Sequence, residues 1–113
     1  MNPILHPGEK IFVVSRRYFE SDTRRHFVGE VDDSTVNVVR ATGFVFVMNP
    51  NNAFERKPEM RTRVFPLSDA RVMIHVIPPT TVLNKVRYVI KDNRLHLWDD
   101  DDFFYDVDEF RQV

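Results

Sequence analysis

The sequence predicts an all-β fold, a small antiparallel barrel of about five to eight strands with an extra C-terminal hairpin and at most one short helical turn. Two observations carry this prediction. The seven prolines are spread along the chain and interrupt helices, and the segments between them are short and rich in Val, Ile, Phe and Thr. With 113 residues, 42% of them hydrophobic, the chain is long enough for one domain spanning 1–113.

The N-terminal half contains three predicted strands, over 11–19, 25–31 and 35–48. Short polar side chains over 32–34 indicate a turn between the last two. Gly43 predicts a bend in the long third strand, since glycine within a strand is typical of bulges and barrel corners.

The segment Phe44–Met48 is apolar at every position. Such a strand is either central and covered on both faces, or it exposes one face to a partner chain. Phe44 and Phe46 are therefore candidate interface residues.

A first hairpin is predicted around the polar loop Asn49–Asn52, which would place Val47 opposite Phe54 and Phe46 opposite Glu55.

A second hairpin is predicted around the two-residue loop Asp92-Asn93. This loop places Ile90 opposite Leu95 and Arg87 opposite Trp98. Across the strands Arg87 and Trp98 would form a cation–π pair, and both are candidate interface residues.

Four further segments complete the prediction. Strands are expected over 61–67 and 71–77, and one helical turn over 79–85, started by Thr80 or Thr81. Alternating residues over 103–107 predict a last strand beside Leu95–Trp98.

Several function classes are excluded or disfavoured. The absence of cysteine excludes disulfides, thiolate metal sites and a cysteine nucleophile. No serine lies in a nucleophile elbow, no glycine-rich loop is present, and the four histidines lack ligand-pair spacing. We therefore expect no enzyme activity, no catalytic residue, no metal and no cofactor.

Without an apolar run of about 20 residues or an export signal, we expect no membrane partner and a cytoplasmic location.

The net charge of −1 conceals two opposed segments. Residues 1–91 carry 14 basic and 9 acidic side chains, whereas residues 92–113 carry 2 and 8. The spacing of the acidic run Asp99–Asp102 does not match an EF-hand loop. The run is interpreted as a solvated hairpin turn, and it could also pair with the basic part of this chain or of another subunit.

Basic side chains with aromatic neighbours form a second candidate site. Arginines next to stacking rings are typical of small barrels that bind single-stranded nucleic acid, although a pI near 6.4 is lower than that of a dedicated binder. The candidates are Arg24, Arg25, Arg61 and Arg63.

The segment Phe27-Val-Gly-Glu-Val-Asp-Asp-Ser-Thr-Val-Asn-Val-Val contains an aspartate and an asparagine four positions apart, between two predicted strands. This pattern resembles the first motif of Sm-like small β-barrel proteins and implies that Asp33 and Asn37 contact RNA at a hairpin tip. The resemblance covers roughly 20 of the 113 residues, and a fold-level analogy does not establish function. The N-terminal helix of that family is interrupted here by prolines, and no glycine follows Gly43, so its second motif is missing.

These observations lead to two expectations. The first is a non-enzymatic small-barrel module that forms a homo-oligomer, as a ring or a strand-paired dimer, or binds another protein. The alternative is an Sm-like protein that binds RNA or another single-stranded nucleic acid.

Overall fold

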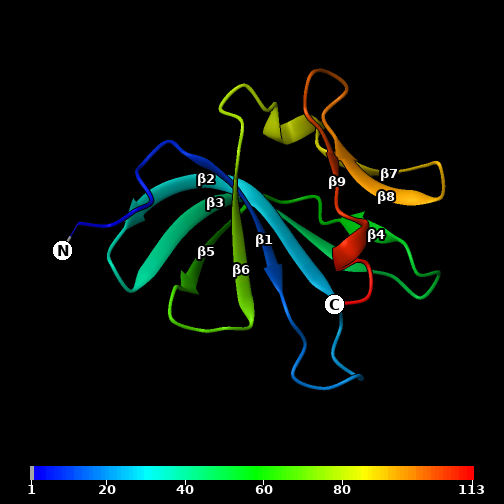
Figure 1. The fold of residues 1–113 in the computed structure, drawn as a ribbon, viewed down its shortest axis with the longest axis horizontal. Helices are drawn as coiled ribbons and strands as arrows, with labels where there is room; N and C mark the ends of the chain where they lie inside the picture. The colour runs from blue at the N-terminus through cyan, green and yellow to red at the C-terminus, as the bar shows by residue number, and fades with distance from the viewer. Residues whose placement is uncertain (1) are drawn as a thin grey trace.

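The structure is a computed structural model that describes residues 2–113. Its nine strands form two antiparallel sheets, which confirms the all-β prediction (Figure 1). Sheet A contains β1 (Lys10–Ser15), β2 (Arg25–Ser34), β3 (Val38–Met48), β4 (Phe54–Arg56), β5 (Arg61–Pro66) and β6 (Val72–Ile77). Sheet B contains β7 (Arg87–Lys91), β8 (Arg94–Trp98) and β9 (Phe104–Asp106). Two 3-10 turns, η1 (Leu83–Lys85) and η2 (Asp108–Phe110), flank sheet B along the chain.

Sheet A is open. Its strands follow the order β4-β3-β2-β1-β6, and β5 pairs with the first half of β3 while β4 pairs with the last three residues of β3. Within residues 2–113 no strand pairing joins β5 to β6. The sheet is therefore curved but not closed, and a complete barrel is not observed.

Close approach of two glycines accompanies the curvature of β2 and β3 (Figure 1). Gly29 and Gly43 lie opposite each other, and a Cβ atom on Gly43 would lie 2.1 Å from the carbonyl oxygen of Val28. Only glycine leaves room for this approach. The irregularity in the β2–β3 register lies elsewhere, between Val31 and Asp33. The predicted turn over 32–34 is wrong, because Asp33 and Ser34 still pair with β3 and the chain reverses after them.

Each face of sheet A carries its own apolar cluster, because side chains alternate along a strand. The intersheet cluster lies between the sheets, and the inner cluster fills the concave face of sheet A. On β1, Phe12 belongs to the first and Val13 to the second. The buried members of the intersheet cluster are Phe12, Val14, Val28, Phe44, Phe46, Ile77, Val86, Leu95, Leu97, Phe103, Val107 and Phe110. Those of the inner cluster are Leu5, Ile11, Val13, Phe27, Val31, Val39, Ala41 and Val45.

The apolar segment of β3 is covered on both faces. Phe44 and Phe46 are buried in the intersheet cluster, and Val45 is buried in the inner cluster. The Arg56 guanidinium also lies over the Phe44 ring, 4.7 Å from its centroid. Of the two alternatives for this strand, the structure therefore shows the central one. Phe44 and Phe46 are core residues here and do not line an exposed face.

The register of the β7–β8 hairpin agrees with the prediction, with Arg87 opposite Trp98 and Ile90 opposite Leu95. Asp92 and Asn93 have φ values of 54° and 62°, the left-handed conformation that a tight two-residue hairpin loop requires.

The predicted β3–β4 register is wrong by one residue, because Val47 lies opposite Glu55 and Met48 opposite Phe54. The Asn49 side chain accepts hydrogen bonds from the backbone of Asn51 and Ala53, and this makes the loop one residue longer. The shift turns Phe54 toward the intersheet cluster.

The segment between β6 and β7 contains the predicted helical turn, but the turn begins later than expected. Val82 precedes η1 and no side chain caps it. The Thr81 hydroxyl instead donates to the Pro78 carbonyl at 2.7 Å. The expected last strand is confirmed as β9, which pairs with β8.

Candidate interaction surface

β5 and β6 are edge strands of sheet A. Each strand pairs on one side only, β5 with β3 and β6 with β1. β5 has two arginines, whereas β6, Val-Met-Ile-His-Val-Ile, has no Lys, Arg, Asp or Glu. An open strand that lacks charge and proline is unprotected against pairing with another chain. We call these two edges and the groove beside them the seam.

The groove of the seam has a volume of about 430 Å³ and a mainly apolar lining. It lies where the inner cluster reaches the surface, because the half-buried Leu67 and Ile74 both line the groove and pack against that cluster. Val76 on β6 is 58% exposed and Ile4 is 89% exposed, and both line it. The seam thus combines unpaired backbone with apolar side chains that water contacts.

Arg87 and Trp98 lie on sheet B, away from the seam in the sequence and in the sheet order. The Arg87 guanidinium is 4.9 Å from the Trp98 ring, which confirms the cation–π pair. The same guanidinium donates to Asp100 at 2.7 Å. Both side chains therefore have partners within sheet B.

The predicted nucleic-acid residues do not form one site. Arg25 and Arg63 line the same pocket of about 200 Å³ on the concave side of sheet A, beside the Phe27 and Phe65 rings. Arg24 extends to Met48, whose Sδ is 3.3 Å from its Nη1.

The other three candidates lie outside that pocket. Arg61 contacts Glu59 at 4.0 Å. Asp33 and Asn37 flank the exposed β2–β3 turn, where the Asp33 carboxylate accepts from the backbone of Ser34. No described contact joins this turn to the pocket of Arg25 and Arg63.

The acidic run does not act as a unit. Asp99 is 1% exposed, and its carboxylate accepts hydrogen bonds from the backbone N–H groups of Asp101, Phe103 and Val82. The carboxylate of Asp99 therefore shapes the β8–β9 loop and ties it to the segment before η1. Sequence reasoning treated all four aspartates alike, because nothing in the run distinguishes the buried member.

Three of the seven other acidic side chains of residues 92–113, Asp100, Asp106 and Asp108, form ion pairs with nearby arginines. Asp100 pairs with Arg87, and Asp106 pairs with Arg94 at 2.6 Å. The hydrogen bond from Arg94 lowers the pKa of Asp106, and the backbone of Asp108 adds to this effect. Among the described residues, the ion pairs of the acidic segment lie within residues 87–111, and none of them involves an arginine of sheet A.

His26 occupies an aromatic cluster between the sheets that the sequence did not indicate. Its ring is 2% exposed and stacks on Phe54 with centroids 4.3 Å apart. Its Nδ1 is hydrogen-bonded to the Tyr88 hydroxyl. Burial lowers the pKa of His26 to about 4, and the Phe110 carbonyl opposes only part of that shift. Burial also raises the pKa of Tyr88 well above its usual value.

The described part of the chain offers no group of three or more His, Asp or Glu side chains arranged to hold a metal ion. In residues 2–113 there is also no helix with the length and hydropathy needed to cross a membrane. Comparisons with protein-family models, with curated proteins and with solved structures found no match for this chain.

Proposed function

We propose that this chain is a non-enzymatic module that associates with further copies of itself through the seam. The observation that carries this proposal is the uncharged open edge of β6 beside an apolar groove. An added strand would satisfy the free N–H and C=O groups of β6, and its side chains would cover the groove.

The composition of the two edges favours β6 as the shared element of the contact. Two β5 edges would bring arginines Arg61 and Arg63 of both copies together, which is unfavourable for like charges across strands. Pairing β6 with β6 gives a two-fold dimer, and pairing β6 with β5 of the next copy generates a ring when the rotation closes. In this proposal the chain is an Sm-like barrel whose open side is completed by a neighbouring copy.

The experiment measures molar mass by light scattering after gel filtration, over about a hundredfold range of protein concentration. Val76→Lys introduces a charge into the groove at an exposed position, so the variant should fold and be monomeric. Ile90→Lys is the matched control, because Ile90 is 55% exposed on β7 and outside the seam. Wild type and Ile90→Lys should form the same oligomer. A monomeric wild type at every concentration would refute the proposal.

A second candidate function, binding of single-stranded nucleic acid, is favoured by the shared pocket of Arg25 and Arg63 next to two aromatic rings. The double variant Arg25→Gln/Arg63→Gln should weaken binding of a short oligo(U) at low salt and reduce the slope of log K against log salt concentration by about 1.4, since each of the two phosphate contacts contributes about 0.7. Arg87→Gln on sheet B is the control. Absence of oligo(U) binding by the wild type at low salt would exclude this candidate.

A further inference from the structure

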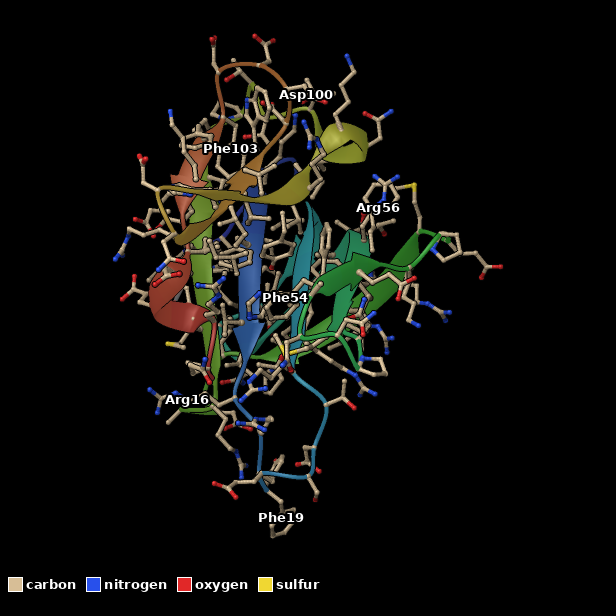
Figure 2. The ribbon with its side chains drawn as sticks, turned by 90° about the vertical axis from the view of Figure 1, so that its right-hand side faces the viewer. Arg16, Phe19, Phe54, Arg56, Asp100 and Phe103 are labelled. Atoms are coloured by element: carbon tan, nitrogen blue, oxygen red, sulfur yellow. The ribbon has the colours of Figure 1, made fainter. Side chains whose placement is uncertain are left out.

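The loop between β1 and β2, residues 16–24, projects from the end of sheet A (Figure 1). Two adjacent aromatic side chains lie on it, Tyr18 at 63% and Phe19 at 71% exposed. Figure 2 shows Phe19 at the extreme end of the molecule, beyond both sheets. Neither proposed function above uses this loop.

The loop is ordered by its own hydrogen bonds. The Asp22 carboxylate accepts from the backbone N–H groups of Tyr18 and Phe19, both at 3.1 Å, and the Asp22 N–H donates to the Phe19 carbonyl at 3.0 Å. Arg17 donates to the Glu20 carbonyl at 2.6 Å. These bonds order the backbone of the loop around Phe19, whose side chain is left exposed.

Four arginines on or beside the loop extend in different directions. The Arg71 guanidinium covers one face of the Tyr18 ring, 3.6 Å from its centroid. Arg17 reaches toward the C-terminal segment, with Nη2 3.5 Å from the Gln112 carbonyl, whereas Arg24 extends to Met48 on β3. Arg25 lies on the concave side of sheet A. These cations therefore do not form a single track.

Residues 16–25 carry a net positive charge, because they contain four arginines and two acidic residues, Glu20 and Asp22. None of these four arginines takes part in an ion pair within residues 2–113, whereas the nearby Arg71 pairs with Asp69 at 3.1 Å. The positive charge of this segment is therefore available to a partner.

We propose that the 16–24 loop docks onto an anionic lipid surface. A protruding aromatic tip on a segment with net positive charge suits a flat surface, with Tyr18 and Phe19 at the interfacial level and the arginines of the segment against headgroup phosphates. A single-stranded nucleic acid would be matched better by cations aligned along one groove. The expectation of no membrane partner rested on the lack of a spanning segment, and a surface loop requires none.

The test uses the full chain and vesicles of phosphatidylcholine with or without about one-third phosphatidylserine. Phe19→Trp places a fluorophore at the tip, and its emission should shift to shorter wavelength with anionic vesicles only. The single native tryptophan, Trp98, lies on sheet B, so wild-type emission should stay unchanged. In sedimentation with the anionic vesicles, Phe19→Ser should lower the bound fraction about fivefold or more, because one loop supplies little apolar area.

Two control variants show whether binding depends on this loop alone. Phe104→Ser removes another exposed aromatic, on sheet B, and should bind as wild type. Val76→Lys tests the loop independently of the seam, because the loop is retained whether or not the chains associate. Wild-type protein that does not sediment with anionic vesicles at low salt would overturn the proposal. So would equal binding by Phe19→Ser, or a response of Phe19→Trp to oligo(U) without any response to vesicles.

Discussion

At the scale of single residues, His26 shows how burial and chemistry combine between the two sheets. Its ring stacks on Phe54, and its Nδ1 is hydrogen-bonded to the Tyr88 hydroxyl. Because desolvation penalises the charged form, the folded protein holds this imidazole neutral down to a pKa of about 4.

This lowered pKa predicts acid sensitivity. In the unfolded chain His26 binds a proton below its ordinary pKa of 6.5, whereas the folded chain does so only near 4. The free energy of unfolding should therefore be constant above about pH 6.5 and fall as the pH drops toward 4, by about 2 kcal/mol at pH 5. Urea unfolding at pH 7 and pH 5 measures this. In His26→Phe the loss of unfolding free energy between pH 7 and pH 5 should be smaller by that amount. An unchanged loss would contradict the lowered pKa of His26.

At the scale of elements, local turn chemistry explains which strand registers could be predicted. The Asp92-Asn93 loop closes with only its own two residues, so the β7–β8 register follows from spacing alone. The β3–β4 loop is lengthened by hydrogen bonds to the Asn49 side chain, so the observed register differs from the predicted one by one residue. Spacing therefore predicts tight hairpins and fails where a side chain joins the loop.

The β8–β9 loop depends on one carboxylate. Asp99 accepts three backbone hydrogen bonds in a buried position, so Asp99→Asn replaces an acceptor by a donor facing N–H groups. The free energy of unfolding should fall by about 2 kcal/mol. Asp102→Asn, an exposed neighbour in the same loop, should change it by less than about 0.5 kcal/mol. Urea unfolding of both variants gives the comparison, and equal effects would show that the run acts only through its total charge.

At the scale of the whole molecule, the net charge of −1 is the sum of a basic region, residues 1–91, and an acidic region, residues 92–113. In Figure 2, Asp100 and Phe19 lie at opposite ends of the molecule, the first on the acidic β8–β9 loop and the second on the 16–24 loop. The charge asymmetry can be read directly along the sequence. The ion pairs cannot, because Arg87 and Arg94 meet their aspartates only once sheet B has formed.

The candidate surfaces could be predicted only in part, because they too depend on contacts that form only when distant parts of the chain have folded together. Arg24 and Arg25 are neighbours in sequence, but alternation of side chains sends them to different sides of sheet A. The apolar Phe44–Met48 segment left two possibilities open, and the packing of sheet B decided between them. The open seam depends on where β5 and β6 end relative to each other, a long-range property without a local sequence pattern.

The central claim, association through the β6 edge, is tested most directly by backbone amide hydrogen exchange of Val72–Ile77. Within one chain, β1 protects only the amides on one side of β6, since alternate N–H groups point to the open edge. We predict that protection of these outward amides rises with protein concentration and is lost in Val76→Lys. Outward amides that exchange equally fast at low and high concentration, while the light-scattering mass increases, would contradict the account.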